Sequence, residues 1–184
     1  CIGVIMIYSA SSIYAFERYK DGFFFLKRHI SFLAIGTILT FLVMCMDYRS
    51  FQRFAKPLLI IAFVLLVLVL IPGIGREVSG ARRWFRFKFL SFQPSEFALL
   101  AVIIYIADFI SRKEALIKSF VRGFLPPMLV LGGISFLILL QPDLGTTVSL
   151  AVVVVSMLFV ARVRLSYIVS ILLSSIPALS LLIL

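Results

Sequence analysis

The feature that most constrains this chain is a series of long apolar runs separated by short polar segments. Crossing the hydrocarbon core of a bilayer takes about 20 apolar residues, and only helices or closed barrels satisfy the backbone there. The runs are continuous rather than alternating, which favours helices. Hydrophobic residues make up 62% of the 184 residues and charged residues 14%, compared with about 45–50% and about 25% in soluble domains. We therefore predict an all-α, polytopic transmembrane helical bundle.

Proline and glycine set the predicted helix boundaries. Pro57 and the pair Pro126-Pro127 fit the first turn of a helix, whereas Pro72-Gly73 and Gln141-Pro142 end one. Both chain ends lie within apolar runs, so we expect a single integral membrane domain over residues 1–184, truncated at both ends. The seven predicted helices are Ile2–Phe16, Ile30–Met46, Pro57–Pro72, Gln93–Ile110, Gly123–Leu140, Leu144–Ala161 and Leu165–Leu184.

The distribution of basic residues points to an anionic ligand. The formal net charge is +10, but the charges lie between apolar runs and form no basic face, which favours membrane lipids over nucleic acid as partners. The connections on the two sides of the predicted bundle carry nine basic residues each, so the positive-inside rule gives no orientation. Segment 73–92 holds five of them with one acid, Glu77. A basic segment on the outer face would suit a pyrophosphate.

The segment from Pro72 to Trp84 is predicted to be a glycine-punctuated loop. Its sequence lacks the spacing of a phosphate-binding glycine fingerprint. Arg82, Arg83 and Arg86 supply forked hydrogen-bond donors beside Trp84, a residue type that favours the membrane interface. Two interpretations remain: an interfacial anchor, or a grip on a lipid phosphate.

Two acidic residues are candidates for chemistry, and each has a structural alternative. Glu96, in Gln93-Pro94-Ser95-Glu96, lies near a predicted helix N-terminus, where the dipole stabilises a carboxylate by roughly 0.3–1 kcal/mol. It could instead be a functional intramembrane carboxylate with the loop arginines as partners. Asp143, in Gln141-Pro142-Asp143-Leu144-Gly145-Thr146-Thr147, fits an N-cap or a second acid that contacts a sugar or a cation.

Other polar residues suggest no further site. His29 is the only histidine and fits an interfacial polar residue at the start of a helix. No His, Cys, Asp and Glu cluster has metal spacing, so we predict no metal site. Asp108 is predicted to be a solvated helix end.

Together, in this order and spacing, the three motifs resemble the shape, elongation, division and sporulation (SEDS) family, to which RodA, FtsW and SpoVE belong. The match runs along essentially the whole chain and includes Ile7–Ser12, and the run Ile71–Trp84 leans toward the FtsW branch. The resemblance implies a ten-helix protein of the bacterial cytoplasmic membrane with a cytoplasmic N-terminus. It thereby places 73–92 and 141–144 outside the cell.

The activity implied by the resemblance is peptidoglycan glycosyl transfer. The 4-hydroxyl of an acceptor GlcNAc in lipid II displaces undecaprenyl pyrophosphate from a donor MurNAc, a step that needs a general base and cations for the leaving group. The family's catalytic aspartate lies in an outer loop after the seventh helix, beyond Leu184. Within the chain, the candidate catalytic residues are Glu96 and Asp143, and the candidate substrate-binding residues are Arg82, Arg83, Trp84, Arg86, Gln93 and Ser95.

The expected partners are lipid II, membrane lipids and a class B penicillin-binding protein transpeptidase. No cofactor is identified, and a divalent cation is left open. The family usually carries a lysine three residues after the glutamate, where this chain has Leu99, so Glu96 is expected to pair with an arginine of the loop instead. The alternative functions are a lipid II flippase, which favours charges deep in helices and inverted repeats, and a non-catalytic scaffold.

Overall fold

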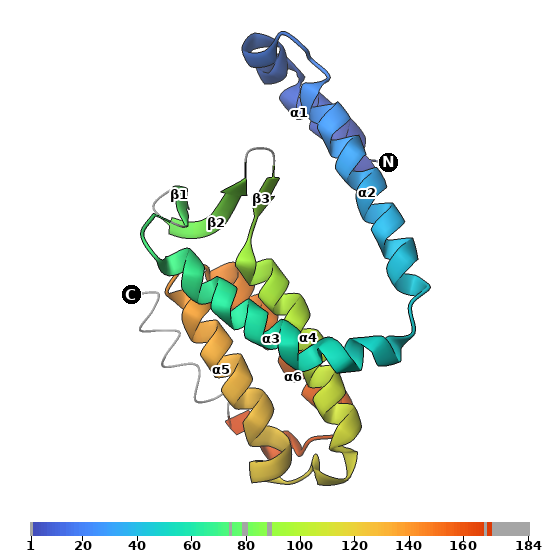
Figure 1. Ribbon diagram of the computed structural model, residues 1–184, viewed down its shortest axis with the longest axis vertical. Coiled ribbons are helices and arrows are strands. Elements are labelled where there is room, and N and C mark those ends of the chain that lie inside the picture. The colour runs from blue at the N-terminus through green and yellow to red at the C-terminus, as the bar shows by residue number, and fades with distance from the viewer. Residues whose placement is uncertain (1, 74, 79–80, 88–89, 168, 171–184) are drawn as a thin grey trace. The chain divides into compact units, whose positions relative to one another are not determined.

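The computed structural model describes residues 2–73, 75–78, 81–87, 90–167 and 169–170. They form two compact units, residues 1–50 and 51–184. In chain order (Figure 1), the elements are α1 (Ile2–Tyr19), α2 (Phe24–Met44), α3 (Tyr48–Leu70), β1 (Arg76–Val78), β2 (Ala81–Phe87), β3 (Leu90–Phe92), α4 (Pro94–Arg112), the short helices Glu114–Leu116 and Phe120–Phe124, α5 (Leu125–Leu139) and α6 (Leu144–Val160).

The first unit is a helical hairpin. Helices α1 and α2 lie against each other, and the rings of Tyr8 and Phe23 stack with their centroids 5.1 Å apart. At the turn, Asp21 accepts hydrogen bonds from Lys27 Nζ at 2.8 Å and from the backbone N–H of Phe23 at 2.9 Å. Helix α2 has no buried residue among those described, as expected of an apolar helix that meets lipid or another helix.

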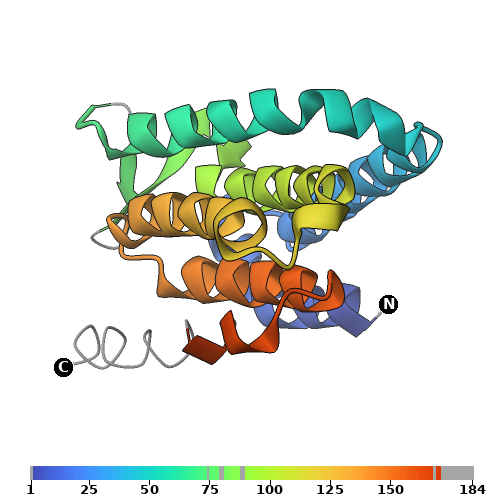
Figure 2. The same cartoon turned by 90° about the horizontal axis from the view of Figure 1, so that it is seen from below.

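The second unit packs α3, α4, α5 and α6 side by side (Figure 2). Its core draws on all four helices, and the buried positions recur every three or four residues, as one face of a helix requires. Alanines at several of these positions let helix backbones approach closely, a common device in membranes. The core includes Ala62 and Leu66 of α3, Ala98, Val102 and Ile106 of α4, Ile134 and Ile138 of α5, and Leu150, Val154 and Leu158 of α6.

Helix lengths and composition agree with a membrane protein. Among the described residues, four stretches are long and apolar enough to cross a bilayer: Phe24–Met44, Tyr48–Leu70, Pro94–Arg112 and Phe120–Leu139. Gly3–Ser12 and Leu144–Val160 are shorter apolar helical segments. The predicted polytopic helical bundle is therefore confirmed. The seventh predicted helix, Leu165–Leu184, falls largely outside the described residues.

Most of the predicted helix ends hold. Pro126 and Pro127 do lie in the first turn of α5, and α3 and α5 end before Pro72 and Gln141. The prediction for Pro57 was wrong, because α3 begins at Tyr48 and contains Pro57 in its interior. The additional turns start where the Asp47 carboxylate accepts a hydrogen bond from Arg49 N at 3.0 Å, a helix-starting contact that the apolar pattern did not reveal.

Segment 73–92 corrects a second prediction, because it forms a three-stranded antiparallel sheet rather than a loop. The strand order is β1-β2-β3, with β2 in the centre. The run Phe85-Arg86-Phe87 alternates aromatic and basic residues in the sequence, a pattern that suits a strand. Between Arg76 and Glu77 the register of β1 against β2 shifts, which leaves Arg83 as the additional residue of a β-bulge.

The prediction that Asp108 is a solvated helix end was also wrong. Asp108 is 6% exposed rather than solvated, and its Oδ1 accepts from Arg112 Nε at 2.7 Å. Arg112 also donates to the backbone carbonyl of Gln52 at 3.5 Å. The ion pair at spacing i, i+4 thus lets a carboxylate lie inside the end of the bundle.

Candidate functional site

The candidate site lies where the small sheet meets the ends of the helices in the second unit. Here α4 begins after Gln93 and α6 begins after Asp143, so two helix N-termini meet around one carboxylate. Asp143 is 7% exposed, and the positive ends of both helix dipoles favour its negative charge. Its Oδ1 accepts from the backbone N–H of Thr146 at 3.3 Å, which confirms the predicted N-cap.

The second carboxylate oxygen of Asp143 accepts hydrogen bonds from side chains at the starts of both helices. Oδ2 accepts from Thr146 Oγ1 at 2.8 Å, from Gln93 Nε2 at 3.1 Å and from Ser95 Oγ at 3.5 Å. Gln93 Nε2 also donates to Ser95 Oγ at 2.9 Å, and Ser95 is fully buried. The motif at the start of α4 and the motif before α6 therefore share one buried hydrogen-bond network.

Arg83 joins the sheet to this network. Its Nε donates to the carbonyl oxygen of Gln141 at 2.8 Å and its Nη2 donates to that of Pro142. Nη1 lies 4.0 Å from Asp143 Oδ1. The bulge at Arg83 directs the guanidinium toward the α5–α6 turn, since bulges commonly re-aim side chains. All three guanidinium nitrogens are thus engaged within the protein.

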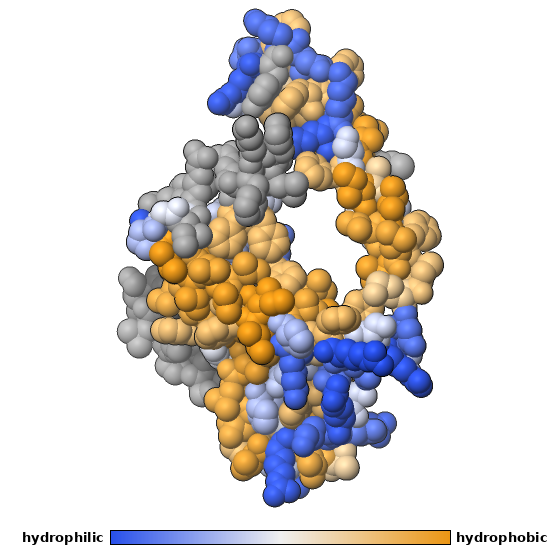
Figure 3. All heavy atoms as spheres, viewed as in Figure 1, coloured by the Kyte–Doolittle hydropathy of each residue, from blue (hydrophilic) through white to orange (hydrophobic). Residues whose placement is uncertain are grey.

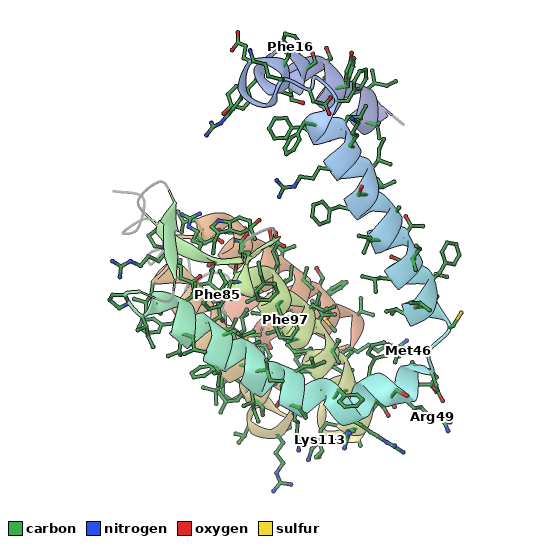
Figure 4. The ribbon with its side chains drawn as sticks, turned by 45° about the horizontal axis from the view of Figure 1, so that its top comes forward. Phe16, Met46, Arg49, Phe85, Phe97 and Lys113 are labelled. Carbon is green, nitrogen blue, oxygen red and sulfur yellow. The ribbon has the colours of Figure 1, made fainter. Side chains whose placement is uncertain are left out.

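Phe85 anchors the same strand on the bundle. It is buried two residues after Arg83, and Figure 4 shows it at the sheet end of the unit, together with Phe97 of α4. Because side chains alternate along a strand, Trp84 belongs to the opposite face of β2 from Phe85. Trp84 and Arg82 are half-buried, and Arg82 pairs in register with Glu77. Of the predicted cluster, the structure directs Arg83 to the α5–α6 turn, and the side chain of Arg86 lies outside the described part of the structure.

Glu96 is placed differently from Asp143. It lies in the first turn of α4, as predicted, but is exposed. Among the side chains that the structure describes it forms no ion pair, and Arg83 is committed to the α5–α6 turn. The expected pairing of Glu96 with Arg86 falls outside the described side chains. Leu99, one helical turn further on, packs half-buried against the core. Of the two candidate acids, Glu96 is consequently the one that is exposed.

Sequence reasoning missed Gln141. It is 1% exposed, its Nε2 donates to the carbonyl of Leu66 in α3 at 3.4 Å, and its Oε1 is buried without a partner in the described structure. From the sequence, the pair Gln141-Pro142 indicated only the end of a helix and gave no role to the Gln141 side chain. No group of three His, Cys, Asp or Glu residues that could hold a metal occurs in the part of the chain that the structure describes.

The fold and the site define a polytopic helical membrane protein in which three sequence motifs converge at one end of a bundle. A family model described as cell cycle protein, covering FtsW, RodA and SpoVE, matches residues 1–184, and the chain belongs to this family. The resemblance stated from the motifs is thereby confirmed.

Individual relatives agree. The chain is 46% identical over 166 residues to the probable peptidoglycan glycosyltransferase FtsW of Trichlorobacter lovleyi, covering 90% of this chain and 44% of that protein. It is 44% identical over 168 residues to the stage V sporulation protein E of Bacillus subtilis, covering 91% and 46%. The chain thus spans about half the length of the curated relatives it matches.

Solved structures place the fold in the same family. The rod shape determining protein RodA of Thermus thermophilus superposes with a TM-score of 0.73 at 30% identity, over 98% of this chain and 58% of that one. A chain of a peptidoglycan synthase complex that coordinates polymerization and crosslinking gives a TM-score of 0.70 at 27% identity, over 96% and 52%.

Proposed function

We propose that the protein containing this chain is a peptidoglycan glycosyltransferase that polymerises lipid II into glycan strands. The observation that carries the proposal is the convergence of three motifs, from β2, α4 and the α5–α6 turn, on Asp143. This convergence occurs in a chain 46% identical to a relative named as such an enzyme. A glycosyl transfer of this kind needs a positioned acceptor and stabilisation of a leaving pyrophosphate.

The geometry suggests different roles for Asp143, Arg83 and Glu96 at this site. Asp143 accepts hydrogen bonds at both carboxylate oxygens, and Arg83 is engaged through all three guanidinium nitrogens. Both therefore act as framework residues, which hold the sheet and two helix N-termini in a fixed arrangement. Glu96 is exposed beside this framework and is the acid available to contact substrate. The general base is expected in the outer loop beyond Leu184, as in the family that the motifs resemble.

A strand-forming assay tests the activity. Purified full-length protein and residues 1–184, in the same detergent, are given labelled lipid II and the products are separated on a gel. We expect strands from the full-length protein and none from the fragment, because loss of a general base alone costs about 10²–10⁴ in rate. Strands made by the fragment at the full-length rate would place the base within these residues. Parallel reactions with EDTA and with Mg²⁺ test for a divalent cation.

The same preparation separates this proposal from the flippase alternative. In vesicles, a flippase would move fluorescent lipid II across the bilayer and make no strands, whereas a polymerase makes strands without vesicles. A catalytically silent scaffold would do neither. Each outcome identifies a different class of protein.

We also propose that the sheet lies on the outer face of the bacterial cytoplasmic membrane. Exposed Ser91 in β3 and exposed Lys113 after α4 mark opposite ends of the second unit. After replacement of the native cysteines, a Ser91→Cys variant should react with an impermeant maleimide in intact spheroplasts, and a Lys113→Cys variant only after permeabilisation. The reverse pattern would invert the topology.

A transpeptidase partner is proposed on a narrower basis. One structural neighbour comes from a peptidoglycan synthase complex that coordinates polymerization and crosslinking, which suggests a class B penicillin-binding protein as the partner here. Co-purification of the full-length protein with its own organism's candidates, using an unrelated membrane protein as control, would test it.

A further inference from the structure

Two adjoining depressions occur at the end of the second unit that lies away from the sheet. The first, of 540 Å³, is polar and is lined by Ser111, Arg112, Glu114, Ala115 and Lys118. The second, of 670 Å³, is an apolar groove between α4 and α6, lined by residues that include Ile110, Ser111, Val153, Ser156 and Met157. Ser111 lines both, so a polar pocket opens directly onto an apolar groove. Each volume falls within the range of about 300–1,000 Å³ that is typical of small-molecule sites.

The surroundings of the pocket are strongly basic. The chain segments at this end, 51–56, 108–122 and 161–167, contain eight Lys and Arg residues against two acids, Asp108 and Glu114. On the face shown in Figure 3, hydrophilic residues gather at this end of the unit, next to the apolar surface of the helices. Figure 4 shows Lys113 at the same end. Such a field raises the local concentration of anions.

Arg112 is held in place by two contacts within the protein. Its Nε is fixed by the buried carboxylate of Asp108 at 2.7 Å and its Nη2 by the Gln52 carbonyl at 3.5 Å. A guanidinium has five N–H donors, so these two bonds leave other N–H groups that can donate to a ligand. Lys118 and the Ser111 hydroxyl line the same pocket. Fixing Arg112 beforehand lowers the entropy cost of binding.

We propose that this pair of depressions is a binding site for one anionic phospholipid. The phosphodiester contacts Arg112, Lys118 and Ser111, and an acyl chain occupies the α4–α6 groove. Free phosphate would gain nothing from the groove, and an uncharged amphiphile would gain nothing from the basic pocket. A ligand that carries both parts matches both depressions. The inference is independent of the proposed glycosyltransferase activity.

The test measures binding of palmitoyl-oleoyl phosphatidylglycerol to the detergent-solubilised full-length protein by native mass spectrometry. Lys118→Gln should weaken binding about fivefold, since a basic residue near a membrane surface contributes about 1 kcal/mol toward anionic lipid. The matched control is Lys113→Gln, which removes the same charge outside the pocket and should leave affinity unchanged. Equal weakening by both variants would indicate a diffuse basic surface and overturn the proposal.

Four further measurements address the groove and the choice of ligand. Ser156→Phe, at an exposed position that lines the groove, should weaken binding by filling the groove, and Glu114→Gln should tighten binding by removing a like charge. Phosphatidylcholine with the same chains should bind more weakly than phosphatidylglycerol. The proposal fails if Ser156→Phe has no effect, if Glu114→Gln weakens binding, or if either phosphatidylcholine or inorganic phosphate binds as tightly.

Discussion

Arg83 Nε donates a hydrogen bond of 2.8 Å to the carbonyl oxygen of Gln141, 58 positions later in the chain. The same guanidinium donates to the neighbouring carbonyl of Pro142 and approaches Asp143. Through these contacts one strand of the small sheet is fixed to the turn that joins α5 and α6. The arrangement of the candidate site therefore depends on a side chain that does not need to touch substrate.

Replacing Arg83 with lysine should destabilise the protein although the charge is kept. A lysine ammonium has all its N–H groups on one nitrogen, so it does not reproduce the planar guanidinium fork that donates to two carbonyls at once. Because hydrogen bonds to charged groups contribute about 1.5–3 kcal/mol, we expect a loss of that order in stability, measured as a lower Tm in detergent. An unchanged Tm would mean that the fork is not needed to hold the sheet.

Gly123 should be intolerant of even a methyl group. A Cβ there would collide with the Leu116 carbonyl oxygen and would lie 2.5 Å from that of Ile117, both backbone atoms. Gly123→Ala should therefore cost about 1–3 kcal/mol by overpacking. The control is Gly132→Ala in α5, where a Cβ meets nothing within 4 Å and should add roughly 0.5–1 kcal/mol of stability. Thermal unfolding of both variants checks the pair, and equal effects would contradict the prediction.

The helices could be predicted from sequence because their signals are local. Runs of apolar residues show where a helix can form, and Pro94, Pro126 and Pro142 mark where one begins or ends. Pro57 was misplaced because the turns before it depend on a cap at Asp47 and on packing, which override a proline signal. The sheet was missed because its strands are short and the glycines around them suggested a loop.

The candidate site was predictable as a set of residues but not as a set of contacts. Gln93, Ser95 and Asp143 were all identified, and the structure brings them together. Arg83 was grouped with Arg82 and Arg86, yet a bulge directs it to the α5–α6 turn. Which arginine faces inward depends on strand register, and register depends on pairing between segments that the sequence alone does not align.

The pKa of the Asp21 carboxyl in the α1–α2 turn should lie below its ordinary value. Its hydrogen bond with Lys27, followed by that from the Phe23 backbone, lowers the pKa below the usual 3.8. Because the folded-state pKa is depressed, the contact stabilises the turn above the unfolded pKa and is lost as pH falls through the folded value. NMR titration of the Asp21 carboxyl should show this, and Lys27→Gln should move its pKa back toward 3.8.

Glu96→Gln should impair activity without affecting stability. Glu96 is exposed and makes no ion pair among the described side chains, so its loss leaves packing unchanged. If it contacts substrate through a charge-assisted hydrogen bond, polymerisation of lipid II should fall about 10- to 100-fold. Its Tm should match that of the unmodified protein. A fall in Tm with proportionate loss of activity would make Glu96 structural.

Leu99→Lys tests the departure from the family pattern. A lysine there lies one turn from Glu96 on the same helix face. Its aliphatic stem can cover the surface that Leu99 now covers while the ammonium reaches solvent. We therefore expect the full-length variant to fold with at most a small fall in Tm. Extensive unfolding would show that the half-buried leucine is required for packing.

Asp143→Asn should be far more damaging than an ordinary change of a capping residue. Asparagine is about as good an N-cap as aspartate, so a residue that only caps tolerates the exchange. Both oxygens of Asp143 accept hydrogen bonds, however: Oδ1 from Thr146 N, and Oδ2 from three side chains, including Gln93 and Ser95. Whichever way the amide is turned, its NH₂ group faces a donor inside the protein.

The expected cost of Asp143→Asn is about 1–3 kcal/mol, the penalty for leaving a buried polar group unsatisfied. The matched control is Asp47→Asn. Asp47 is exposed, and its carboxylate accepts from Arg49 N at the start of α3, a bond that an asparagine oxygen can accept equally well. That change should stay within about 0.5 kcal/mol. Thermal unfolding of the two variants in one detergent compares them directly. If both are mild, Asp143 is a simple cap, and the network that joins α4 to α6 contributes little to the fold.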